Sequence, residues 1–83
     1  MGYIETMEIE QIPGLRHQVH YFLGEGYRMY AAFLLETDAK FFAQSESKMT
    51  GRRFRVVETF SIEPQIVAVY ENGHSIPQEV FIE

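Results

Sequence analysis

Turn-forming residues recur about every ten positions along this chain of 83 residues, and their spacing limits what the chain can fold into. Glycine, proline and small polar residues supply the backbone conformations that tight turns need, so they separate one element from the next. A segment of about ten residues holds one strand or one short helix. The turn signals fall at positions 13–14, 24–26, 37–38, 50–51, 63–64 and 72–73.

The length predicts one domain over residues 1–83, because domains typically hold roughly 100–200 residues. Leu, Ile, Val and Phe make up 24 of the 83 residues, which is above the share of about 20% below which disorder is expected. A domain this small has a thin core, so self-association would add to its buried surface.

The C-terminal third reads as strands. Between 52 and 62, Phe54, Val56, Phe60 and Ile62 alternate with polar residues, which is the pattern of a half-buried strand, although positions 57 and 58, Val and Glu, depart from it. Residues 65–71 form a second β-branched run, and the Asn-Gly pair at 72–73 suits a type I′ hairpin turn. A short run at 79–83 follows a proline, so we expect three antiparallel strands here, the last at an edge.

The middle of the chain predicts a helix over about residues 39–49. Asp38 would be its N-cap and Gly51 its C-cap, and apolar residues such as Phe41, Phe42 and Met49 fall within one broad arc. Periodicity leaves residues 15–23 and 27–36 open between helix and strand. As strands they would form a hairpin through the glycines at 24–26, and residues 3–10 also read as a strand.

These patterns predict an α+β fold, an antiparallel sheet with one helix at about 39–49 packed on one face. Thirteen Ile and Val against four Leu favour sheet. The alternative is an all-β meander or small barrel of about seven strands, which the regular turn spacing also suits.

Composition removes several classes of protein. Without cysteine, the chain has no disulfide framework, cysteine–zinc site or iron–sulfur cluster. It has no run of about 18 apolar residues and no secretion signal at its start, so we expect a cytoplasmic protein that does not enter a membrane. No phosphate-binding loop or nucleophile motif is present, so we lean away from an enzyme and expect no cofactor.

Histidines are the only candidates for a metal site. His17 and His20 share a face only if their segment is helical, whereas on a strand they point to opposite sides. His74 could complete a site only through the fold. We therefore expect surface or hydrogen-bonded histidines and no bound metal.

Charge is segregated along the chain. Residues 40–57 hold five cations and one glutamate, a balance of +4, while the remainder holds two cations and eleven acids, a balance of −9. On a strand, Arg53 and Arg55 would project from one face and, with Lys48 and Arg52, could bind phosphates or an acidic protein surface.

Aromatic residues are numerous, twelve Phe and Tyr in all, and more than one thin core can cover. We expect Tyr27 and Tyr30, with the basic cluster, to lie in a partner interface. The sequence predicts a small non-enzymatic interaction module, regulatory or inhibitory, that acts as a homodimer or binds another protein. The alternatives are a nucleic-acid-binding protein using residues 48–55, and a small ligand-binding domain or enzyme with an aromatic pocket.

Overall fold

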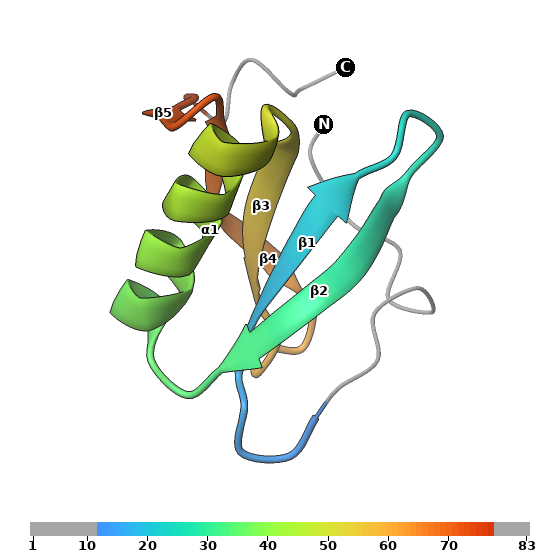
Figure 1. Ribbon diagram of the computed structural model, residues 1–83. Helices are drawn as coiled ribbons and strands as arrows, with labels where there is room; N and C mark the ends of the chain where they lie inside the picture. The colour runs from blue at the N-terminus through green and yellow to red at the C-terminus, as the bar shows by residue number, and fades with distance from the viewer. Residues whose placement is uncertain (1–11, 78–83) are drawn as a thin grey trace.

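The computed structural model describes residues 12–77, in which one helix lies against a five-stranded sheet (Figure 1). All strand pairs are antiparallel, in the order β2-β1-β3-β4-β5. The predicted α+β fold is confirmed, and the helix rules out the all-β alternative. The predicted strands at 3–10 and 79–83 lie outside the described residues. Along the chain the elements are β1 (His17–Phe22), β2 (Tyr27–Phe33), α1 (Glu36–Thr50), β3 (Arg53–Glu58), β4 (Gln65–Glu71) and β5 (His74–Ser75).

The segment that the sequence left open is a hairpin of two strands. β1 and β2 pair from Phe22 opposite Tyr27 to His17 opposite Phe33. Gly24 takes a positive φ of 94° in the turn between them, which only glycine adopts freely. Tyr30 has no Cα partner in β1, so β2 carries a β-bulge at this residue.

Helix α1 begins earlier than predicted. Its N-cap is Leu35, and Ala39 N–H already donates to the Leu35 carbonyl at 3.2 Å. The expected N-cap role of Asp38 is therefore wrong. Asp38 lies in the first turn of the helix. Its negative charge there interacts favourably with the positive end of the helix dipole, but Asp38 is not the N-cap residue. The predicted C-cap is confirmed, since Gly51 has φ 74° and its N–H donates to Ser47 O at 2.9 Å.

Strand β3 ends sooner than predicted. The Glu58 carboxylate accepts hydrogen bonds from the N–H groups of Phe60 and Ser61, at 2.7 and 2.8 Å, and turns the chain away from the sheet. Phe60 and Ile62 are therefore exposed in the following loop, 58% and 99%, and are not buried strand residues. The turn at 72–73 agrees with the sequence, because Asn72 and Gly73 both have positive φ, 54° and 82°.

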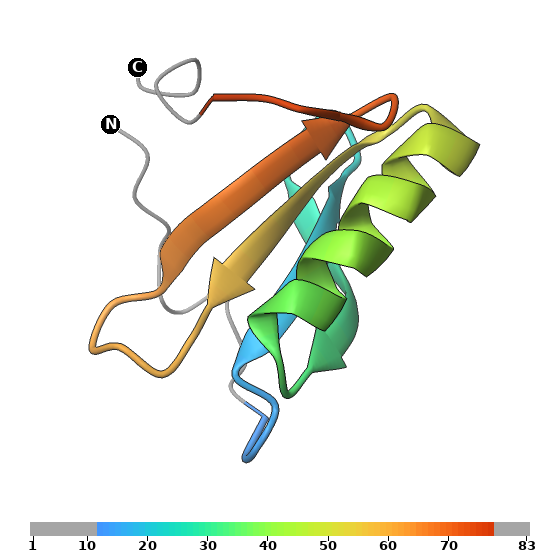
Figure 2. The same ribbon diagram turned by 90° about the vertical axis from the view of Figure 1, so that its left-hand side faces the viewer.

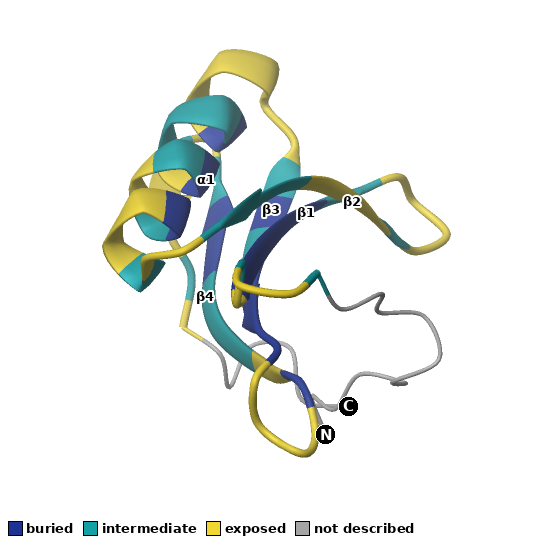
Figure 3. Ribbon diagram, turned by 90° about the horizontal axis from the view of Figure 1, so that it is seen from below, coloured by how far each residue is buried: buried dark blue, intermediate teal, exposed yellow. Residues whose placement is uncertain are grey.

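The helix packs closely on the sheet because the residues it buries are small. Ala39, Ala43 and Ser47 follow one another at i, i+4 and i+8 and are fully buried. Figure 2 shows α1 on one side of the sheet, and Figure 3 shows that its buried residues are toward the strands. We call this side the helix-side face and the opposite one the helix-free face. The helix-side core includes Val19, Phe54, Val56 and Tyr70.

Two helix side chains hold the turn between β4 and β5. Ser47 Oγ accepts from Gly73 N–H at 2.9 Å, and Gln44 Nε2 donates to Gly73 O at 2.9 Å. Both backbone polar groups of Gly73 are thus satisfied by α1. A Cβ at this position would lie 3.0 Å from Lys48 Cβ, which is closer than two carbon atoms normally approach.

Gly73→Ala should lower the free energy of unfolding by about 1–2 kcal/mol. Alanine is strained in a left-handed backbone conformation, and its Cβ would be too close to the Lys48 side chain. Urea unfolding followed by circular dichroism measures the change. Gly26→Ala is the matched control, since a Cβ there meets nothing within 4 Å and no positive φ is required. Equal stability losses in the two variants would contradict this account.

Candidate functional site

The structure divides the predicted basic cluster. Arg53 and Arg55 lie in β3 on the helix-free face, where they pair with Glu71 and Val69 of β4. Lys48 lies on α1 and packs against the turn at Gly73, on the other side of the sheet. Arg52 is exposed ahead of β3, and its guanidinium lies 5.9 Å from the ring centroid of Tyr21. The four cations therefore do not form one patch.

Both arginines of the helix-free face contact aromatic rings at the β1–β2 hairpin. The Arg55 guanidinium lies 3.9 Å from the ring centroid of Tyr27, and that of Arg53 lies 5.8 Å from the ring of Phe22. The two rings are themselves 5.1 Å apart. Arg53 also forms an ion pair with Glu71 at 3.2 Å. Tyr27, predicted as a partner-binding residue, is thus part of a stacked cluster within the chain.

A buried polar chain continues from Arg55. Its Nε donates to His20 Nδ1 at 3.0 Å, so the His20 proton is on Nε2, which donates to Gln18 Oε1 at 3.0 Å. Gln18 and His20 are only 1% and 3% exposed. Burial and, second, the Arg55 charge lower the pKa of His20 to about 3. His20 is therefore neutral at physiological pH.

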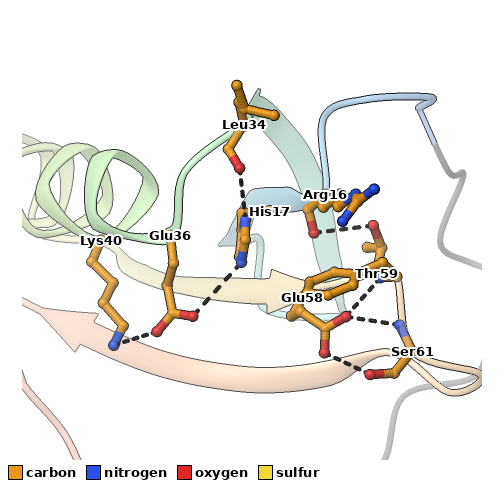
Figure 4. Close-up of polar contacts among 9 residues, drawn as sticks. Arg16, His17, Leu34, Glu36, Lys40, Glu58, Thr59 and Ser61 are labelled. Carbon is orange, nitrogen blue, oxygen red and sulfur yellow. Dashed lines mark hydrogen bonds and ion pairs between the residues drawn. The ribbon is translucent and has the colours of Figure 1, made fainter.

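His17 belongs to a different network on the helix side. Its Nδ1 lies 3.3 Å from the Leu34 carbonyl and its Nε2 3.7 Å from Glu36, which also pairs with Lys40 at 2.7 Å (Figure 4). The hydrogen bond from Lys40 holds the pKa of Glu36 below its ordinary value. These contacts join β1 to the start of α1.

The three histidines do not converge. His17 and His20 lie on opposite faces of β1, and His74 is exposed in the short strand β5. Within residues 12–77, no three His, Cys, Asp or Glu side chains are placed to hold a metal ion together.

A hollow of about 410 Å³ lies at the end of the sheet beside the β3–β4 loop. Thr59 fixes one wall, because its N–H and hydroxyl both donate to the Arg16 carbonyl, at 2.8 and 3.1 Å. The Arg16 guanidinium lies 5.0 Å from the ring centroid of Phe60. The described lining residues of the hollow do not include a set of converging catalytic side chains. Its lining residues are Ile12, Pro13, Gly14, Arg16, Thr59 and Phe60.

The edge of the sheet at β2 carries several exposed apolar residues. Tyr30 is 50% exposed, although its ring stacks on Phe42 and Phe54 with centroids 5.7 Å away in each case. Its hydroxyl donates to Glu46 at 3.2 Å, and the Glu46 charge raises the pKa of Tyr30, so the phenol stays protonated. We define the apolar edge as four exposed residues of β2 and the connection to α1: Met29, Tyr30, Leu34 and Leu35.

The outer side of α1 also carries exposed apolar residues. Phe41 and Met49 are 75% and 78% exposed. The sequence placed both in one arc with Phe42, but only Phe42 reaches the sheet, where its ring lies 5.2 Å from that of Phe33. The difference arises because α1 buries the narrow stripe of small residues and leaves the larger ones beside it uncovered.

Sequence reasoning missed several residues of these sites. Phe22 and Glu71 contact Arg53 across strands, and Gln18 accepts from His20 two residues along β1, but each of the three is unremarkable in sequence. Glu71 could have been identified by its charge, because it is opposite Arg53 once the register between β3 and β4 is known.

No protein-family model matches the sequence, and neither a curated protein nor a solved structure gives a significant match. Within the described part of the chain, no helix is long and apolar enough to cross a membrane.

Lowering the pH from 7 to 5 should destabilise the fold through His20. The unfolded chain takes up a proton below about pH 6.5, whereas the folded chain does so only near pH 3. Acid therefore favours unfolding in this window, by about 2 kcal/mol at pH 5. Urea unfolding at pH 7 and at pH 5 measures the loss in the free energy of unfolding. In His20→Gln this loss should be smaller than in the wild type by about 2 kcal/mol.

His74→Gln is the matched control, because it removes an exposed histidine and should keep the wild-type pH dependence. If His20→Gln lost as much stability between pH 7 and 5 as the wild type does, His20 would not be the responsible group.

Proposed function

We propose that this protein is a small non-enzymatic interaction module that acts as a homodimer and regulates or inhibits a partner protein. The observation that carries the proposal is the apolar edge together with Phe41 and Met49 of α1. Each of these six residues is at least 43% exposed. Several large exposed apolar residues in one small domain are typical of a protein–protein contact.

The composition of this surface supports a protein partner. Aromatic residues and methionine are enriched in the centres of protein interfaces. Phe41 and Met49 are eight residues apart on α1, which corresponds to about 12 Å along the helix axis. The pair could contact an apolar groove of a partner while the β2 edge contacts a second copy.

The nucleic-acid alternative has less support. A phosphate-binding surface needs several cations on one exposed face. Lys48 lies apart from the two arginines of β3, and these arginines already contact Glu71, His20 and aromatic rings. For the ligand-binding alternative, the hollow beside Phe60 offers one aromatic ring among its described lining residues.

Native mass spectrometry of the full chain at micromolar concentration tests the proposal, and we expect a dimer. Leu34→Glu should raise the dimer dissociation constant about ten-fold or more, because it places a charge in the contact. Leu34 is 62% exposed and only its backbone carbonyl contacts His17, so the fold should survive.

Ile62→Glu is the matched control. Ile62 is 99% exposed but lies in the β3–β4 loop, outside the apolar edge, so this substitution should leave the dimer unchanged. A wild-type chain that stays monomeric at tens of micromolar would overturn the homodimer.

A further inference from the structure

We infer that the homodimer forms by antiparallel pairing of β2 with β2 of a second copy, in the register that places Tyr30 opposite the partner's Ala31. This inference rests on the homodimer proposed above and specifies its geometry. It would join two five-stranded sheets into one.

The outer edge of β2 is open within residues 12–77. β2 is the first strand of the sheet, and its only pairing there is with β1. An open strand presents unpaired N–H and C=O groups, which natural proteins protect with charged residues, proline, a β-bulge or a covering segment; β2 carries one arginine and one bulge. β2 is seven residues long and contains neither lysine nor proline.

The β-bulge at Tyr30 decides which residues of β2 share a face. Tyr30 and Ala31 both lie on the helix-side face, because Tyr30 stacks on Phe42 and Ala31 packs on the core. The alternation is therefore reversed on the two sides of the bulge. The helix-side face carries Arg28, Tyr30, Ala31 and Phe33, and the helix-free face carries Tyr27, Met29 and Ala32.

This reversal selects one register for two antiparallel copies. Directly opposite residues in a sheet must lie on the same face. A pairing centred on Tyr30 would set Met29 opposite the partner's Ala31. This register is excluded, because Met29 lies on the helix-free face and Ala31 on the helix-side face. Shifting by one position sets Met29 opposite the partner's Ala32 and Arg28 opposite the partner's Phe33, and all pairs from 28 to 33 then agree.

The side chains in this register are complementary in size. Tyr30 lies across from the partner's Ala31, and Met29 across from the partner's Ala32, so a large residue meets a small one on each face. At the ends, Arg28 lies across from the partner's Phe33, which allows a cation–π contact. Such cross-strand pairs are the contacts that stabilise a sheet.

One charge pair favours this arrangement, while the same register also brings Glu25 of the hairpin turn toward the partner's Glu36. Arg28 is the only charged residue of β2 and is exposed. At the other end of the strand, the first turn of α1 carries Glu36 and Asp38. Asp38 precedes Phe42 by one helical turn and so lies on the flank of α1 that faces β2. Antiparallel pairing brings Arg28 of each copy to the acidic end of the other.

Disulfide trapping tests the register. Because the sequence has no native cysteine, only the introduced thiols can form a disulfide. In Met29→Cys/Ala32→Cys, the two thiols face each other across the copies, with Cα atoms about 5.5 Å apart, within disulfide range. Each single variant leaves its thiols about 10 Å apart, which is too far. Under mild oxidation, the double variant should give at least about ten times more linked dimer than either single variant.

Ser75→Cys is the matched control, because it places one thiol on β5 at the opposite edge of the sheet, and it should stay unlinked. Efficient linking of Met29→Cys or Ala32→Cys alone would overturn the register. A wild-type dimer in native mass spectra without linking of the double variant would overturn β2 pairing and leave the homodimer standing. A monomeric wild type would overturn both the homodimer and the β2 pairing. A monomer is also the result expected if another segment of the chain covers β2.

A size swap provides a second test that needs no oxidation. Ala32→Met sets two methionines opposite each other and should raise the dimer dissociation constant about ten-fold. Met29→Ala/Ala32→Met restores one large and one small residue in each pair and should recover the wild-type constant. If the double variant dimerised no better than Ala32→Met, while thermal melts showed both folded, the register would be wrong.

Discussion

The close approach of α1 to the sheet is the contact on which the rest of the structure depends. Ala39, Ala43 and Ser47 have little volume, so the helix backbone can lie near Phe54 and Val56 while these fill the core. Ser47 adds a polar tie, since its hydroxyl donates to Gln44 O and accepts from Gly73 N–H. The narrow contact also leaves the larger residues of α1 exposed, and so creates the surface proposed for a partner.

The two faces of the sheet are stabilised by different physics. The helix-side face is an apolar core of valine, alanine and aromatic residues under α1. The helix-free face contains a hydrogen-bonded chain of Arg55, His20 and Gln18 beside stacked rings. A buried polar chain of this kind is stable only while each member keeps its partner and its protonation state. The stability of the helix-free face therefore depends on pH through His20.

Much of the fold followed from local sequence, and the errors have identifiable causes. The turns at Gly51 and at 72–73 were predictable because positive φ angles demand glycine or asparagine. The start of α1 was not, because Leu35 has no capping side chain. The end of β3 was missed because the Glu58 carboxylate, acting on neighbouring N–H groups, interrupts an alternating pattern that continues to Ile62.

The sequence by itself predicted one helix before two strands and the placing of Arg53 and Arg55 on one face, because these follow from short-range periodicity, but it left an all-β fold open until the structure showed α1 on the sheet. Only the tertiary structure decided that Lys48 is remote from them, that Glu71 and His20 are their partners, and that β2 is an edge strand with a bulge at Tyr30. Strand order and register depend on pairings between residues far apart in the chain, which no local pattern encodes.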